Sequence, residues 1–340
     1  MKRFILISMM ALVAVGAWGQ DLATFQTGFT TFSADMASTL SYNATVGNNW
    51  SDAYLGSFPH FGVGLAGGVT AVPSASLEAL FTSMGVTMPS SVKDFGLPVP
   101  AAALSAKIGG LFLPFDVGVK AMILPEAVAS SLSASGITAD YQLFGGNVRF
   151  GLVKEGLLFP DVSVGAGYNR LSGSISMPLD TATQTYTFND GSTDQSLTVT
   201  DPDLSMEWTT DSFDFTLQVS KKFLFIRPYL GTGLSVGKST VKGGMAASMV
   251  YDPDTATASD EYILTDANLA AIKQSLADAG LDVPDISADG FMFGSENSDP
   301  VIRLYGGFSL ELLILSLDLQ GTYVPSTKSL GASAMVRVEL

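Results

Sequence analysis

Hydrophobic and polar residues alternate with a period of two in ten stretches of the chain. The clearest is the last, 334–340, where Val336 and Val338 fall on one face while Arg337 and Glu339 fall on the other. Successive side chains of a β-strand point to opposite sides, so each stretch is predicted to be a strand. The ten predicted strands cover residues 60–69, 104–108, 116–123, 147–152, 161–169, 213–220, 226–236, 302–312, 315–320 and 334–340.

The two faces of these strands differ in charge. No charged residue falls on an apolar face. The opposite faces carry six bases and six acids, namely Lys107, Lys120, Arg149, Arg227, Arg303 and Arg337 together with Asp116, Asp161, Asp214, Glu311, Asp318 and Glu339. A soluble β-sandwich alternates in the same way, so the alternation alone does not separate a sandwich from a barrel whose apolar face meets lipid.

The connections between the predicted strands separate these two folds. Tight turns at 110–115, 155–160, 221–225 and 312–314 alternate with connections at 71–102, 124–139, 172–212, 239–299 and the shorter 325–329. Tight turns at one end and long loops at the other are typical of an outer-membrane barrel. The pattern therefore predicts an all-β fold, a transmembrane antiparallel up-and-down barrel of about ten strands within a range of eight to fourteen. An even number of strands places both termini on the periplasmic side.

The composition favours the same fold. The 340 residues are 47% hydrophobic and only 14% charged, without cysteine, and the mean hydropathy is +0.33. Soluble domains carry about 25% charged residues. Past residue 20 no run approaches the roughly 18 apolar residues of a spanning helix, and closed barrels are the other structure that spans lipid. The hydrophobicity excludes a disordered chain, and the missing cysteine excludes a disulfide scaffold or a thiolate metal site.

The first nineteen residues are predicted to be a cleaved signal peptide. Lys2 and Arg3 precede an apolar run at 4–15, and Ala17 and Gly19 suit a cleavage site. Loss of the two bases takes the net charge from −15 to −17. An exported anionic protein is a poor partner for nucleic acid.

These features together resemble a bacterial outer-membrane β-barrel protein. The resemblance covers Phe58 to Leu340, and it differs from the class in ending on Leu340 instead of an aromatic residue. It implies a location in the bacterial outer membrane, with outer-membrane lipid and the barrel-assembly machinery as partners. The expected organisation is a signal peptide at 1–19, an N-terminal helical plug or periplasmic segment at 20–57, and the barrel at 58–340.

The long loops are expected to contain short helices. Ser74 and Thr265 can cap helices that Gly85 and Gly280 end, and a weaker pattern runs from Pro125. These helices either pack together as a cap over the mouth or decorate the loops independently. Residues 171–220 and 251–300 hold 19 of the 32 acids. We interpret this charge as a solvated surface, because its spacing does not match an EF-hand calcium loop.

An amphipathic helix is predicted just before the barrel. Its apolar side consists of Phe25, Phe29, Phe32, Met36 and Leu40. This helix either plugs the lumen or packs under the periplasmic rim. An eleven-stranded barrel can hold a helix, so ten strands are borderline and a true plug would favour twelve or more.

The sequence offers no catalytic set, metal site or cofactor site. The one histidine, His60, is expected at the periplasmic rim, so we predict that the chain is not an enzyme. The inward face instead mixes charges with glycines that leave space. Two functions remain open. One is a passive channel or uptake barrel for small or amphipathic solutes, gated by the N-terminal segment. The other is a closed structural or surface-interaction barrel, adhesin- or antigen-like, whose charges form ion pairs.

For either function, the expected luminal residues share the polar face of the strands. They set selectivity in a channel and pair with one another in a closed barrel. They are Lys107, Asp116, Lys120, Arg149, Asp161, Arg227, Arg303, Glu311, Asp318, Arg337 and Glu339.

Overall fold

The computed structural model describes residues 22–53, 60–83, 87–88, 90–110, 114–178, 183–189, 192–257, 260–278, 287–288 and 290–339. The predicted signal peptide lies outside these residues. The helices are α2 (Leu22–Asn43), α3 (Ser74–Ser83), α4 (Ser90–Phe95), α5 (Glu126–Ser133) and α6 (Asp266–Asp278). The strands are β1 (His60–Val72), β2 (Leu97–Gly109), β3 (Phe115–Ile123), β4 (Thr138–Val153), β5 (Asp161–Pro178), β6 (Gln184–Asn189), β7 (Asp194–Ser220), β8 (Ile226–Asp252), β9 (Tyr262–Ile263), β10 (Gly290–Asn297), β11 (Val301–Leu312), β12 (Leu315–Val324) and β13 (Ser329–Glu339).

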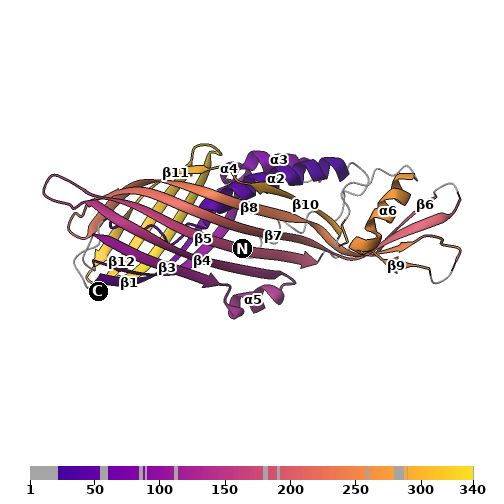
Figure 1. Cartoon of the computed structure of the whole chain (residues 1–340), viewed down its shortest axis with the longest axis horizontal. Helices are drawn as coiled ribbons and strands as arrows, with labels where there is room; N and C mark the ends of the chain where they lie inside the picture. The colour runs from indigo at the N-terminus through magenta and orange to yellow at the C-terminus, as the bar shows by residue number, and fades with distance from the viewer. Residues whose placement is uncertain are drawn as a thin grey trace.

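Ten of these strands close into an antiparallel barrel (Figure 1). The order around the wall is β8, β11, β12, β13, β1, β2, β3, β4, β5 and β7, and pairing of β7 with β8 closes the ring. β6, β9 and β10 pair only with the long outer parts of β7 and β8. The prediction of a ten-stranded antiparallel barrel is confirmed.

The barrel has two different ends. The tight connections β2–β3, β4–β5, β7–β8 and β11–β12 lie at one end, together with the C-terminus, and we call it the turn end. The other end carries α3, α5, α6, β6 and β9, and we call it the loop end (Figure 1). No helix among the described residues is long and apolar enough to cross a membrane.

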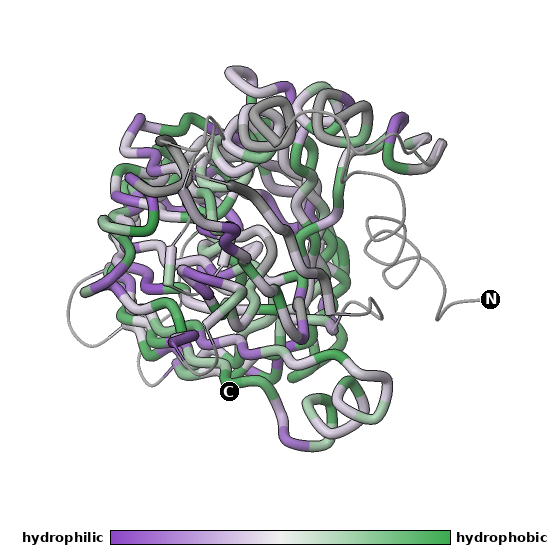
Figure 2. Tube along the Cα trace, turned by 90° about the vertical axis from the view of Figure 1, so that its right-hand side faces the viewer, coloured by the Kyte–Doolittle hydropathy of each residue, from purple (hydrophilic) through white to green (hydrophobic). Residues whose placement is uncertain are grey.

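The alternation along each strand corresponds to its two faces. Apolar residues predicted to face outward are exposed on the wall, as with Val119, Phe213 and Val336, whereas Lys107 and Asp116 of the polar face are buried inside. Figure 2 shows the hydropathy along the same strands, viewed from the loop end. The inside of the barrel therefore holds the polar face of each predicted strand.

The strands at the loop end are longer than expected, and this corrects two of the predicted loops. β5 continues to Pro178 and β7 begins at Asp194 within the expected connection 172–212, and β8 continues to Asp252 within 239–299. In these outer parts the apolar residues face inward: on β8, Val236 is exposed, but Val241 and Met249 are fully buried. The pattern was missed because its phase reverses where the apolar outer surface ends.

The predicted loop helices are present, with one addition and no common cap. α3, α5 and α6 match the expected positions, and α4 was not predicted. α3 packs on α2, and α6 contributes the buried Ile272 to the same apolar core, whereas α5 buries none of its residues. The three helices therefore neither all pack together as a cap over the mouth nor all lie independently on their loops.

Candidate functional site

The N-terminal segment, residues 22–53, enters the barrel at the loop end, with Thr30 and Thr31 still exposed and the residues from Met36 onwards mostly buried. α2 contacts β8, β10 and α3 near the loop end. The following chain at 44–53, which we call the luminal chain, is almost entirely buried. It contacts side chains of β2, β3, β4, β5, β7 and β13. Ten strands thus enclose this chain, although a plug was expected to favour twelve or more.

Helix α2 fills the loop half of the lumen with apolar side chains. Phe29, Phe32, Met36 and Leu40 are all buried, and the rings of Phe29 and Phe32 meet edge to face at 5.8 Å between centroids. They join a core with inward wall residues that include Val99, Leu143, Leu171 and Val241. The side chain of Phe25, the remaining member of the predicted stripe, lies outside the described part of the chain. This half of the lumen is packed like the interior of a soluble protein.

Two lysines of the wall bind the backbone of the luminal chain. Lys120 Nζ donates to the carbonyl oxygens of Ala44 at 2.5 Å and Val46 at 2.9 Å. Lys107 Nζ donates to Asn48 O at 2.7 Å. This part of the chain forms irregular turns after the end of α2, so these carbonyl oxygens lack regular helical partners and buried donors from the wall satisfy them.

Neutral side chains of the wall continue this pattern towards the turn end. Gln218 Nε2 donates to Trp50 O at 2.7 Å and Ser51 O at 3.1 Å. The backbone N–H of Ala53 donates to Ser220 Oγ at 2.9 Å. The wall therefore holds the luminal chain along its length, and most of these bonds are to backbone atoms of the luminal chain instead of its side chains.

Asp52 is the acidic group that the luminal chain brings into the lumen. Its carboxylate accepts from Arg337 Nη1 at 2.6 Å and lies 3.4 Å from Arg149 Nη2. Arg149 also donates to the backbone carbonyl of Asp52. Burial alone would raise the pKa of Asp52, but the two guanidinium groups outweigh it and hold the pKa well below its usual range. Asp52 is therefore ionised and bridges the luminal chain to β4 and β13.

Trp50 is the largest fully buried side chain in the described part of the chain. The ammonium of Lys107 and the guanidinium of Arg337 each lie 5.1 Å from the centre of its ring. A side chain at Gly62 on β1 would meet the ring at 2.8 Å. A flat ring between two cations is stabilised by cation–π attraction, and glycine on the wall gives it room.

The six predicted luminal acids all have basic partners. Asp116 pairs with Arg149 at 2.7 Å and Asp214 pairs with Arg303 at 2.5 Å. The remaining four acids pair with two arginines: Asp161 and Glu311 with Arg227, and Asp318 and Glu339 with Arg337. The eleven residues predicted for the lumen and Asp214 of the same polar face thus all lie on the inner face. Ten of these twelve are in ion pairs, and the two lysines bind the luminal chain.

The inward glycines give room to these large side chains. A side chain at Gly233 would meet the guanidinium of Arg303, and one at Gly231 would meet the ring of Tyr305. A side chain at Gly243 would meet the ring of Phe29 from α2. The space that the glycines were expected to leave is therefore occupied by side chains of the wall and of the N-terminal segment.

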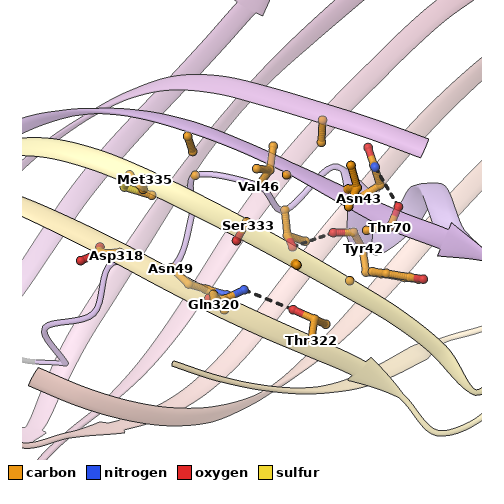
Figure 3. Close-up of a pocket in the computed structure, with 18 of the residues that line it drawn as sticks. Tyr42, Asn43, Val46, Asn49, Thr70, Asp318, Gln320, Thr322, Ser333 and Met335 are labelled. Carbon is orange, nitrogen blue, oxygen red and sulfur yellow. Dashed lines mark hydrogen bonds between the residues drawn. The ribbon is translucent and has the colours of Figure 1, made fainter. Parts of the chain in front are cut away.

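Small cavities remain beside the luminal chain. One of about 40 Å³ lies between Tyr42, Asn43 and Val46 on one side and β1, β12 and β13 on the other (Figure 3). Asn43 Nδ2 donates to Thr70 Oγ1 across it at 2.9 Å. A groove of about 760 Å³ lies on the outer surface of the same wall, beneath Phe95 of α4. Both are lined by the same five wall residues, Val69, Thr70, Thr322, Gly331 and Ala332, so one thin sheet separates the cavity from the groove.

Sequence reasoning missed Trp50 and Asp52. It counted charges only on the predicted strands and assigned residues 20–57 to a helical segment. The signal that could have found them is the polar run from Asn43 to Asp52, which follows an apolar helix and carries one aromatic and one acid.

The described residues hold no group of three or more histidines or acids placed to bind a metal ion. His60 begins β1 at the turn end, and its Nε2 lies 4.0 Å from Glu339 Oε2. This is the rim position expected from the sequence.

A model for a family of unknown function, DUF6588, matches residues 20–283. No curated protein matches the chain. Among solved structures, the outer membrane protease OmpT from Escherichia coli aligns with 84% of this chain and 99% of its own, at 8% identity and a TM-score of 0.36. LpxR from Salmonella typhimurium aligns with 82% of this chain and 99% of its own, at 8% identity and a TM-score of 0.27. The toluene transporter TbuX from Ralstonia pickettii aligns with 87% and 91%, at 10% identity and a TM-score of 0.26.

These similarities concern outer-membrane barrels with different activities. The prediction that this chain is not an enzyme is contradicted, because the first of the matched structures is a protease. A barrel architecture therefore gives no ground for excluding enzymatic activity.

Proposed function

The chain belongs to a family of unknown function, DUF6588, and from the contents of its lumen we propose that it is an uptake barrel of the bacterial outer membrane. Its lumen passes small or amphipathic solutes when the N-terminal segment moves, and this segment is the plug. The barrel-assembly machinery would insert the whole barrel into the membrane, and outer-membrane lipid would surround its apolar wall.

The observation that carries the proposal is how the wall holds the luminal chain. Lys107, Lys120 and Gln218 bind backbone carbonyl oxygens, which water can replace when the chain leaves. The one charged latch is Asp52 with its two arginines. The lumen is apolar in its loop half and charged in its turn half, which suits an amphipathic solute with an apolar and a polar part.

The alternative is a closed structural or surface-interaction barrel. It is favoured by the pairing of all six luminal acids, which leaves no carboxylate of this set free to select ions. In that case the N-terminal segment is a permanent part of the core.

A disulfide between plug and wall distinguishes the two functions. A Cβ at Gly47 would lie 3.8 Å from Cβ of Ala66 on β1, close to the mean Cβ separation of disulfides, about 3.8 Å. Since the chain has no cysteine, the double variant Gly47→Cys, Ala66→Cys can form only one disulfide within the molecule. We expect the oxidised protein to give no channel openings in a planar bilayer with KCl, and reduction to restore openings.

The matched control is each single cysteine variant, because Gly47 has a φ of +80° and strains any side chain. Openings of the double variant that persist once its disulfide has formed would contradict a moving plug. Absence of openings in the wild type, in the reduced double variant and in the Asp52→Asn variant would favour the closed barrel.

A second prediction concerns the membrane. Phe215 is exposed midway along the apolar outer face of β7, whereas Glu207 is exposed on the same strand near the loop end. Phe215→Arg is expected to weaken folding into lipid vesicles by about 2–4 kcal/mol, the cost of arginine at the bilayer midplane. Glu207→Arg should change it by less than about 1 kcal/mol. Equal effects, measured by urea titration, would contradict a lipid-facing wall.

A further inference from the structure

The turns at one end of the barrel expose large apolar side chains at their tips. Three connections each present three consecutive apolar residues to the surface: 157–159, 223–225 and 312–314. Leu157 is 96% exposed, Leu224 is 87% exposed and Leu313 is fully exposed. Turns that face water are normally polar, so this ring of tips, visible at the left-hand end of Figure 1, needs a partner.

The backbone of two of these turns holds a leucine in a strained conformation. Phe223 and Ile226 exchange both backbone hydrogen bonds around Leu224 and Phe225. Leu312 and Leu315 are cross-strand partners around Leu313 and Ile314. Leu224 and Leu313 have φ values of +56° and +57°, in the left-handed region. This first central position of a two-residue hairpin favours glycine. A leucine there strains the backbone, and a compensating environment for its side chain accounts for its presence.

Several polar groups of the tips have partners within the protein. Lys221 Nζ, from the β7–β8 connection, donates to three carbonyl oxygens of the neighbouring β4–β5 turn, those of Gly156, Leu157 and Phe159, at 3.1, 3.1 and 3.4 Å. The backbone N–H of Gly156 donates to Phe159 O at 3.0 Å. Bonds of this kind reduce the number of backbone groups that a hydrocarbon environment would leave without a partner.

The tips are also continuous with the apolar outer wall. Ile226 follows Phe225 directly on β8, and Leu315 follows Ile314 on β12, with their side chains exposed on the outer face. No charged outward residue separates tip from wall on these two strands.

We propose that the turn tips at 157–159, 223–225 and 312–314 are immersed in the periplasmic leaflet of the outer membrane instead of projecting into the periplasm. The barrel then ends within lipid at its turn end, and the tips fix its depth in the bilayer. This rests on the proposed membrane location but is independent of transport.

Spin labels test this, because the chain has no cysteine of its own. Leu158→Cys, Leu224→Cys and Leu313→Cys are each labelled with a nitroxide and reconstituted in phosphatidylcholine–phosphatidylglycerol vesicles. Accessibility to oxygen and to a polar nickel chelate is then measured. Leu65→Cys on the outer wall and Thr257→Cys in an exposed loop are the matched controls.

We expect the tip labels to resemble Leu65→Cys, with nickel accessibility roughly tenfold below that of Thr257→Cys, because hydrocarbon excludes polar solutes. Tips that resemble Thr257→Cys, while Leu65→Cys is in lipid, would overturn the inference and leave the proposed function standing. Tips shielded from both reagents would also overturn it, because they would then contact a second copy of the chain. If Leu65→Cys is itself accessible to nickel, the membrane location fails with it.

Discussion

Replacing Asp52 by asparagine is expected to release the plug from the wall while the ten strands of the wall stay paired. The variant leaves Arg149 and Arg337 without the carboxylate that lies between them, and both guanidinium groups are buried. Removing one partner of a buried ion pair costs about 3–5 kcal/mol. The lower end of this range applies, because Arg149 keeps Asp116 and Arg337 keeps Asp318. Since each 1.4 kcal/mol is tenfold, the population of the open state should rise by roughly two orders of magnitude. Channel openings in a planar bilayer measure it directly.

Asp211→Asn is the matched control for this variant. Asp211 pairs with Arg170 at 3.2 Å on the exposed outer surface, where an ion pair contributes about 1 kcal/mol or less. It should leave channel opening at the wild-type level. Asp52→Asn with unchanged conductance, in a protein whose gel mobility still shifts on heating as a folded barrel does, would contradict the latch.

The same latch predicts how closure responds to acid. Because the folded-state pKa of Asp52 is depressed, its ion pairs contribute fully at any pH above the ordinary carboxyl range. This contribution is lost only as the pH falls below that range towards the lower folded value. The plug should therefore stay in place at neutral and mildly acidic pH. Opening with a midpoint near neutrality would show that another group controls it.

Truncation of Trp50 to alanine is the second large effect that we expect. The indole is fully buried between Lys107, Arg337 and Gly62. Tryptophan-to-alanine changes in a packed core cost about 3–5 kcal/mol. The temperature at which the barrel loses its folded gel mobility should fall, and channel openings should become more frequent.

A second substitution tests whether the indole acts by filling space beside Gly62. Gly62→Leu alone should displace the ring, because even its Cβ lies within 2.8 Å of it. Overpacking of this kind costs about 1–3 kcal/mol. In the Trp50→Ala background the same leucine fills part of the vacated volume and should restore stability. Additive losses in the double variant would show that ring and glycine are not coupled.

The wall of the barrel was predictable because its rule is local. Period-two alternation placed Val336 outside and Arg337 inside, and all eleven luminal residues followed from the same parity. The outer parts of β7 and β8 were not recognised, since their apolar residues, such as Val241, turn inward where the surroundings change. A fixed assignment of apolar residues to lipid cannot detect that reversal.

The site itself depended on a contact that local patterns do not contain. The glycines of the wall signalled empty space, but nothing near Gly62 in the sequence indicates that Trp50 fills it. Likewise Asp52 belongs to a short polar run, and its partner Arg337 is 285 residues away. The six acids and six bases of the wall balance one another, whereas the luminal chain adds a seventh acid, Asp52, and occupies both lysines.

The most direct test of a plugged lumen compares the planar-bilayer conductance of the mature chain with that of a variant lacking residues 22–53, after both have passed the heat-mobility test for a folded barrel. We expect rare openings for the chain that keeps its N-terminal segment and continuous, stepwise channels for the variant. Equal conductance of the two, whether high or absent, would contradict a plugged lumen.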